Sequence, residues 1–243
     1  MTFKKEQYPR MTLVMLCLFS ILLISFSSLI RNNNSYTKDE LLGKINPASD
    51  PNFSEIPSKC CIRSGMYLRI EVLDAFLELY KNAEDENIKL VVISATRPFH
   101  HQKSIWDKKW ERSQYMGWQD FEKARDILKY SSMPGTSRHH WGTDLDLNAL
   151  ENSYFETKEG NNVYDFLERC GGELGFAQVY TSKSNGRTGY EEEKWHWSYM
   201  PVSSVMLEEY NELITTKDID GFNGSAIVDS IQIIANFVNG ITK

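Results

Sequence analysis

The chain has 243 residues, which is enough for one domain or two small ones. Its net charge is −6, and because the first ten residues carry three basic side chains and one acidic side chain, the rest of the chain carries −8. An acidic body without a stripe of lysines and arginines lacks the charge pattern of nucleic-acid-binding proteins. We therefore expect no nucleic-acid partner.

A basic head and an apolar run open the chain. Lys4, Lys5 and Arg10 precede the apolar segment 11–30. This order is typical of a secretory signal peptide, and the run is also long enough for an uncleaved membrane anchor. Both alternatives predict an exported protein of the cell envelope, on its periplasmic or extracellular side. They differ in whether residues 1–30 are removed or stay in the membrane.

The next segment, residues 31–58, is polar and rich in turn formers such as Asn46-Pro47 and Asp50-Pro51. This composition predicts a tether with one short helix over 38–43. The compact domain is then expected to begin near Pro57 and to comprise residues 59–243.

Helices and strands follow one another through that domain. Apolar residues at helical spacing predict a helix over 66–85, and a β-branched run predicts a strand over 90–93. Two further strands are expected over 143–147, with one face buried, and 195–199; further helices are expected over 98–112, 120–129 (capped by Asp120), 163–173, 202–215 and 224–238. This order favours an α+β fold with a small, mainly antiparallel central sheet flanked by helices.

Four cysteines are present, Cys17, Cys60, Cys61 and Cys170. None of them forms a C-x-x-C pair, which argues against a structural zinc ribbon. In an oxidising compartment either Cys60 or Cys61 can pair with Cys170, and free thiols are the alternative.

Two short segments concentrate the chemically useful side chains. Residues 137–146 read S-R-H-H-W-G-T-D-L-D, and residues 193–196 read E-K-W-H; together they hold three of the five histidines of the chain. Two neutral imidazoles, one carboxylate and one spare carboxylate are the parts of a hydrolytic zinc site with an open fourth position. The combination predicts a metal-dependent hydrolase.

Strand geometry assigns the candidate ligands. Asp144 and Asp146 are two residues apart, so both side chains lie on one face of the strand. His139 is seven residues before Asp146, an odd separation that an unbroken strand would place on the opposite face. Gly142 offers the irregularity that lets His139 come from a loop. His139 and Asp146 can then share a metal with His196.

Two side chains remain alternatives at this site. Asp144 is an alternative to Asp146 as the carboxylate ligand, and His140 is an alternative to His139. Glu193 is expected to stay off the metal, because a hydrolytic site needs a carboxylate that takes a proton from water and passes it to the leaving amine. Glu193 is therefore the candidate general base and acid.

The motif S-x-H-x-x-G-x-D-x-D of residues 137–146, followed by E-x-W-H of residues 193–196, resembles the signature of the zinc D-alanyl-D-alanine carboxypeptidases of the vancomycin-resistance type. That family shares a fold group with lysostaphin-type peptidases and the sonic hedgehog amino-terminal domain. S-A-T-R of residues 94–97, followed by Gln102, resembles a third family motif. The resemblance covers roughly residues 65–205. It departs from the family at Asp144, where a small apolar residue is common, and at Ala95-Thr96, which replace Gly-Tyr.

The resemblance implies a hedgehog/DD-peptidase-like fold and a zinc peptidase that removes the C-terminal D-amino acid of peptidoglycan stem peptides. It implies Zn²⁺ on His139, Asp146 and His196, catalysis by Glu193 and by Arg97 as oxyanion stabiliser, and substrate binding by Ser137 and Gln102. An L,D-carboxypeptidase or a peptidoglycan endopeptidase is the alternative within the enzyme class. A non-catalytic, metal-stabilised cell-wall-binding domain is the alternative outside it. The oligomeric state is left open.

Overall fold

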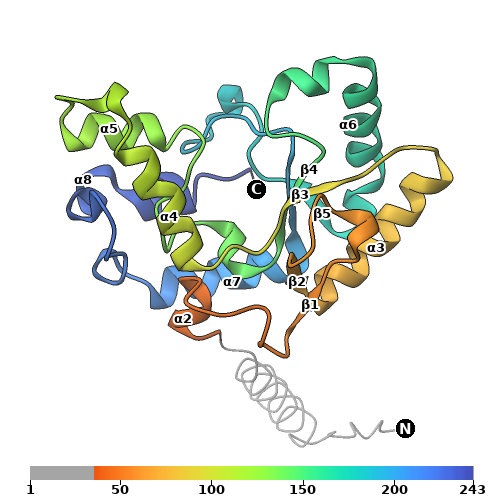
Figure 1. Ribbon diagram of the computed structural model, residues 1–243, viewed down its shortest axis with the longest axis horizontal. Helices are drawn as coiled ribbons and strands as arrows, with labels where there is room; N and C mark the ends of the chain where they lie inside the picture. The colour runs from red at the N-terminus through yellow and green to blue at the C-terminus, as the bar shows by residue number, and fades with distance from the viewer. Residues whose placement is uncertain (1–35, 243) are drawn as a thin grey trace, which may run out of the picture. The chain divides into compact units, whose positions relative to one another are not determined.

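A four-stranded antiparallel sheet forms the centre of the fold (Figure 1). The structure is a computed structural model, which describes residues 36–242. The strand order is β3 (Val92–Ser94), β4 (Asp144–Leu147), β6 (His196–Tyr199) and β5 (Phe176–Gln178). A separate two-stranded sheet pairs β1 (Phe53–Glu55) with β2 (Tyr67–Arg69). The predicted α+β fold with a small antiparallel sheet is confirmed.

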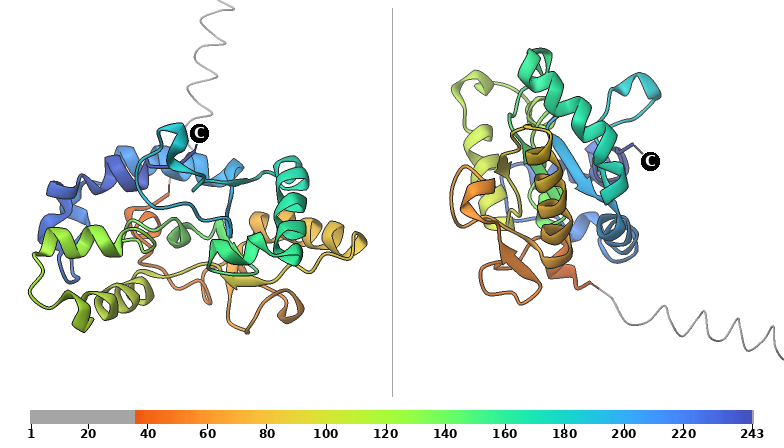
Figure 2. Two further views of the ribbon diagram at one scale, coloured as in Figure 1. Left: turned by 90° about the horizontal axis from the view of Figure 1, so that it is seen from above. Right: turned by 90° about the vertical axis from the view of Figure 1, so that its right-hand side faces the viewer.

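Seven α-helices surround the sheets within the described part of the chain: α2 (Lys38–Leu41), α3 (Ile70–Asp85), α4 (Phe99–Trp110), α5 (Asp120–Ile127), α6 (Lys158–Cys170), α7 (Met200–Leu213) and α8 (Val228–Ile231). Figures 1 and 2 both place α3 and α6 at one end of the sheet and α4, α5 and α8 at the other. None of the described helices is long and apolar enough to cross a bilayer. The predicted signal peptide or anchor over 11–30 lies outside the described residues.

The main apolar core lies between the sheet and helices α3 and α6. Leu145 and Leu147 of β4 are fully buried and belong to the same cluster as Phe76 of α3 and Phe166 of α6. The two aspartates that alternate with these leucines are buried as well. The expectation of one buried face for this strand is therefore wrong. One face of β4 packs on the core and the other lies within the polar site described below.

Several helices begin at residues other than those that the sequence predicts, through strand pairing in one case and through local capping in others. The helix expected over 66–85 begins at Ile70, because residues 67–69 pair with β1. Asp120 is the first helical residue rather than a cap, since Gln119 occupies the N-cap and no side chain caps that helix. The helix expected over 163–173 begins at Lys158, where the hydroxyl of Thr157 accepts a hydrogen bond from Gly160 N.

The C-terminal segment 224–238 is not the single closing helix that its composition predicts. Helix α8 ends at Ile231 after four residues. The next residue, Gln232, is the C-cap and has a left-handed φ of 54°. A π-helical turn over Ile234–Val238 follows. The break divides the segment into two short pieces.

Residues 37–58 do not form the predicted tether; they belong to the compact unit that begins at Thr37. Leu41 and Leu42 are buried, and the indole of Trp141 donates a hydrogen bond to Leu41 O at 3.0 Å. Phe53 packs so closely against Gly142 that a Cβ at this glycine would collide with the phenyl ring. The N-terminal segment thus supports the turn that carries the predicted metal ligand His139.

The described cysteines are free thiols. Cys60 is buried, and Cys61 and Cys170 are partly buried. Neither of the two disulfide pairings considered from the sequence forms in the structure. Cys17 lies outside the described residues.

Candidate metal centre

The register of β4 and β6 brings the first two candidate ligands together. Asp146 lies directly opposite His196 across the antiparallel pair. The Oδ1 atom of Asp146 lies 3.1 Å from Nδ1 of His196. Because facing residues of an antiparallel pair project on the same side of the sheet, the two side chains meet on one face.

The third candidate ligand comes from the turn before β4. His139 lies in the 3₁₀ turn η4 (Arg138–Trp141), which ends at Gly142 with a left-handed φ of 74°. Glycine adopts this conformation without steric cost, so the chain turns into β4 here. The Nε2 atom of His139 lies 3.2 Å from Oδ2 of Asp146. The predicted break at Gly142 is confirmed.

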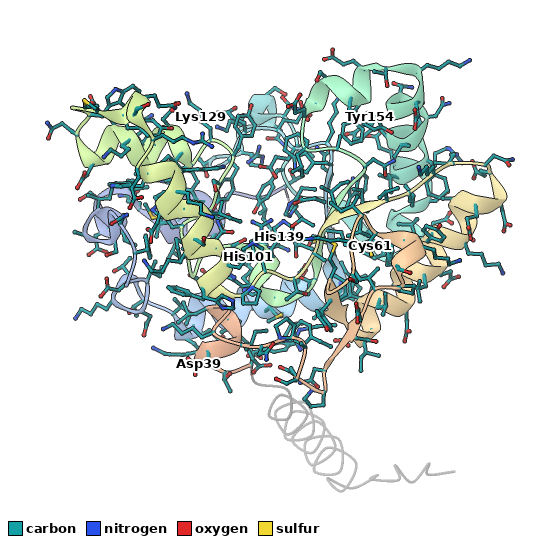
Figure 3. The ribbon with its side chains drawn as sticks, viewed as in Figure 1. Asp39, Cys61, His101, Lys129, His139 and Tyr154 are labelled. Atoms are coloured by element: carbon teal, nitrogen blue, oxygen red, sulfur yellow. The ribbon has the colours of Figure 1, made fainter. Side chains whose placement is uncertain are left out.

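The three side chains form a metal-binding constellation. His139, Asp146 and His196 are buried, and each offers a ligand atom within 4.8 Å of the others. His139 lies near the middle of the view in Figure 3, whereas Lys129 and Tyr154 lie towards its edge. Two imidazole nitrogens and one carboxylate oxygen suit Zn²⁺, with bonds of about 2 Å and a fourth position left for water or substrate. The residues present therefore fit the metal that the sequence predicts.

Hydrogen bonds fix which nitrogen of each histidine faces the centre. Nδ1 of His139 lies 2.9 Å from Ala95 O, so it donates a proton there and leaves Nε2 as a ligand. His196 has the opposite orientation, because its Nε2 lies 2.9 Å from Oδ1 of Asp144 and its Nδ1 faces Asp146. A metal would accordingly meet Nε2 of His139 and Nδ1 of His196.

The structure places both alternative ligands outside the three-residue constellation. Asp144 lies behind His196 rather than beside the other ligand atoms, and it is not part of the constellation. His140 donates from Nδ1 to Arg97 O and accepts at Nε2 from Gly135 N, so neither nitrogen is left for a metal. Burial lowers the pKa of His140 to about 3, which keeps the ring neutral. The geometry therefore favours Asp146 over Asp144 and His139 over His140.

Glu193 lies beside the ligands without joining them. It is not part of the three-residue constellation, although its Oε2 atom lies 3.6 Å from Nδ1 of His196. Burial raises the pKa of its carboxyl to about 8, against the opposing effect of His196. A buried carboxyl whose pKa lies near neutrality is suited to accept and return a proton.

A cavity of about 290 Å³ opens onto the centre. Its wall includes the three candidate ligands and Glu193, and it also includes Arg97, Ser137, Tyr130, Leu150 and Trp195. Its volume is close to the lower end of small-molecule sites. The predicted catalytic residues and Ser137 thus share one wall with the metal centre.

Arg97 is held towards this cavity by two side chains. Its Nη1 donates to Oε1 of Gln102 at 2.7 Å, and its Nη2 donates to Oγ of Ser94 at 2.8 Å. Nη2 also lies 3.7 Å from Oδ2 of Asp146. Gln102, predicted from the sequence to bind substrate, is fully buried and is not among the residues that line the cavity. It holds the arginine instead.

Three residues near the centre carry no role in the sequence-based assignment. Arg138 and Ser198 form hydrogen bonds around Asp144, and the ring centroid of Tyr180 lies 4.6 Å from that of His196. Arg138 directly precedes the candidate ligand His139. Ser198 lies two positions after the candidate ligand His196 on the same strand, β6. Strand parity places Ser198 on the face of His196, which is a usable signal; Tyr180 lies in a loop and has none.

Comparison with known proteins gives consistent matches. A family model described as VanY, D-alanyl-D-alanine carboxypeptidase, matches residues 65–202. A curated D-alanyl-D-alanine carboxypeptidase of Enterococcus faecalis is 26% identical over 157 residues, which is 61% of this chain and 57% of the relative. The match thus spans little more than half of that relative's length.

Solved structures share the fold at low sequence identity. VanYB in complex with D-alanine-D-alanine has a TM-score of 0.50 and 22% identity, covering 70% of this chain and 88% of that one. A mutant of the vancomycin-resistance D,D-pentapeptidase VanY in complex with Zn(II) has a TM-score of 0.51 and 22% identity, covering 72% and 93%. The LD-carboxypeptidase LdcB has a TM-score of 0.52 and 20% identity, covering 68% and 75%. The hedgehog/DD-peptidase-like fold expected from the sequence agrees with these neighbours.

Proposed function

The chain belongs to the VanY D-alanyl-D-alanine carboxypeptidase family, and on this premise we propose that it is a zinc-dependent peptidase that removes the C-terminal D-amino acid from peptidoglycan stem peptides. The observation that carries the proposal is the convergence on one cavity of the three-ligand centre, Glu193 and Arg97. A metal site that served only stability would need neither a buried spare carboxyl nor a held guanidinium. The Zn(II) and D-alanine-D-alanine complexes of the fold neighbours support the choice of metal and substrate.

Each residue has a distinct task in this proposal. Bound zinc would supply Lewis-acid polarisation of the scissile carbonyl and a water that ionises near neutral pH. Glu193 takes the proton of the attacking water and delivers it to the leaving amine. Arg97 donates to the carbonyl oxygen as negative charge develops there, and Gln102 and Ser94 hold its guanidinium in place.

We propose that residues of the cavity wall bind the end of the peptide and determine which terminal residue is accepted. Ser137 is buried and lines the cavity, and we propose that its hydroxyl binds the terminal carboxylate of the peptide. Ala95 and Thr96 replace the family's Gly-Tyr, yet neither side chain lines this cavity. Thr96 donates instead to Tyr67 O, away from the centre. We therefore assign preference for the terminal residue to other wall residues, such as Tyr130 and Leu150.

Digestion of muropeptides by the zinc-loaded protein, read by mass spectrometry, tests the function. Loss of one D-alanine from a pentapeptide stem is the expected result. Loss of the terminal D-alanine from a tetrapeptide stem alone would instead establish an L,D-carboxypeptidase, and release of larger fragments an endopeptidase. Retention of intact muropeptides without cleavage would establish the non-catalytic binding domain and overturn the proposal.

The proposed substrate locates the protein in the cell envelope, on the periplasmic or extracellular side. The basic head and apolar run of residues 1–30 support export, either by a cleaved signal peptide or by an anchor. Sequencing of the N-terminus of the protein recovered from its host distinguishes the two. A start near residue 30 indicates cleavage, and an intact start in the membrane fraction indicates an anchor.

A further inference from the structure

Asp144 is a fully buried carboxylate that the proposed mechanism does not use. Its Oδ1 accepts from Nε of Arg138 at 2.9 Å and lies 2.9 Å from Nε2 of His196. Its Oδ2 accepts from the hydroxyls of Thr143 and Ser198. Burial of a charged group is costly unless its hydrogen-bonding capacity is filled, and here four donors fill it.

The contact with His196 has a direct consequence for the metal centre. Donation to Asp144 requires a proton on Nε2 of His196. In the neutral ring that a metal binds, the lone pair is then on Nδ1, which faces Asp146. A carboxylate behind a ligating imidazole fixes the tautomer and the ring orientation, and it raises the basicity of the ligand. Asp144 therefore acts on the centre through His196 without contacting the metal.

Arg138 forms a buried ion pair with Asp144, with Nε 2.9 Å from Oδ1. Its side chain is 1% exposed, its Nη2 donates to Oγ of Ser198 at 2.6 Å, and its guanidinium lies 4.8 Å from the ring centroid of Trp141. Its Nη1 has no partner in the described part of the protein. Arg138 directly precedes His139 in the turn η4, and Asp144 lies on β4. The Arg138–Asp144 ion pair therefore connects the turn that carries one ligand to the sheet face that carries the other two.

Stability alone is a weak explanation for this pair. A buried ion pair costs desolvation that its attraction often does not recover, and apolar residues of similar volume are frequently as stable or more so. The unpartnered Nη1 adds to that cost. The pair is better explained by what it imposes on His196.

We propose that Asp144 and Arg138 are positioning residues, which hold His196 with Nδ1 directed to the metal and thereby set the zinc affinity of the centre. This inference rests on the proposed zinc peptidase function. It gives a task to the carboxylate at a position where the family commonly has a small apolar residue. Zinc affinity and the ligating nitrogen are measured without any peptide, so failure of the positioning role is distinguishable from failure of the proposed activity.

The test compares the double variant Arg138→Met/Asp144→Leu with the wild type and with Ser198→Ala. Zinc affinity is measured by competition with a chromophoric chelator, and the ligating nitrogen of His196 by ¹⁵N NMR of the zinc-loaded wild type. We expect ligation through Nδ1 and a 10- to 100-fold loss of affinity in the double variant. Ser198→Ala removes a hydroxyl that contacts both charged residues but leaves the His196 contact, so we expect less than about a threefold change, well below that range.

Three outcomes overturn the inference: wild-type affinity in a folded double variant, ligation of His196 through Nε2, or an equal loss of affinity in Ser198→Ala. If the double variant does not fold, Asp144→Asn decides. The amide oxygen of the asparagine still accepts from Nε2 of His196, but the side chain lacks the negative charge of the carboxylate. The expected loss of zinc affinity is therefore smaller, at most about tenfold. Unchanged affinity in a folded Asp144→Asn variant contradicts the role of the carboxylate charge.

Discussion

Asp146 and His196 occupy directly opposed positions on β4 and β6, with Oδ1 of the aspartate 3.1 Å from Nδ1 of the histidine. The metal centre is therefore specified by the register of one antiparallel pair, and a shift of one residue would turn one ligand to the core. His139 joins from a turn that Gly142 makes possible. Two elements of regular structure and one turn are sufficient to build the centre.

Metal removal is expected to abolish hydrolysis and to lower thermal stability. Zinc binds the folded centre, so saturating metal stabilises the native state by mass action, by about 2.7 kcal/mol at a hundredfold excess over Kd. Treatment with a chelator followed by a melting curve and a muropeptide assay measures both effects. Restoration of activity and of Tm by added Zn²⁺ is the control. Full activity after exhaustive chelation would contradict a metal-dependent mechanism.

Glu193→Gln is expected to lower kcat by roughly 10²- to 10⁴-fold, the usual contribution of general acid–base catalysis. Zinc content should stay at the wild-type level, because Glu193 is not part of the constellation of His139, Asp146 and His196. Elemental analysis and a hydrolysis assay measure the two quantities. Glu191→Gln, at a partly exposed position paired with Lys183, is the matched control and should retain activity. Undiminished hydrolysis by Glu193→Gln would remove the residue from the mechanism.

Arg97→Lys is expected to lower kcat by about 10²-fold, similar to the loss of one oxyanion donor, with little change in KM. Lysine keeps the charge but loses the fork that Gln102 and Ser94 hold. Gln102→Leu fills a similar volume and removes one of these two contacts, so it should lower kcat in the same direction by a smaller factor. A rise in KM alone in either variant would favour a ground-state binding role instead.

Local chemistry made most of the centre predictable from the sequence. Alternation along β4 separates Asp146 from the core leucines, and an odd spacing to His139 requires a break that glycine supplies. The choice between Asp144 and Asp146 was not accessible in this way, because both project on the same face. Arg138 and Ser198, which hold Asp144, lie six residues before it and 54 after it, and only tertiary packing reveals their convergence.

Segments whose structure depends on distant partners were predicted least well. Residues 37–58 have the composition of a tether, yet Leu41 and Leu42 are buried and Trp141 donates to Leu41 O. Trp141 lies one hundred residues from Leu41 in the sequence, so no local sequence pattern predicts their contact. Gln102 illustrates the same limit at the level of one side chain, since its amide nitrogen donates to Ser132 O, thirty residues away in the sequence.

The attachment of the N-terminal segment gives a prediction of stability against pH. Lys38 of α2 lies 2.8 Å from Oδ1 of Asp218, and Thr215 also donates to this carboxylate. These hydrogen bonds lower the pKa of Asp218 to about 2. A carboxyl with a depressed pKa in the folded state stabilises the protein above its unfolded pKa of about 4, and that contribution disappears as the pH falls towards 2.

Asp218→Asn is therefore expected to destabilise the protein at pH 7 by about 1 kcal/mol, a value reduced for the solvent exposure of the pair. The difference from the wild type should stay constant down to about pH 5, shrink as the pH falls further and vanish below about pH 2. Urea unfolding across this range measures it, with Asp229→Asn as a control at a carboxyl outside this cluster. A difference that persists unchanged at pH 2 would show that the substitution acts through packing and that the Lys38 contact contributes nothing.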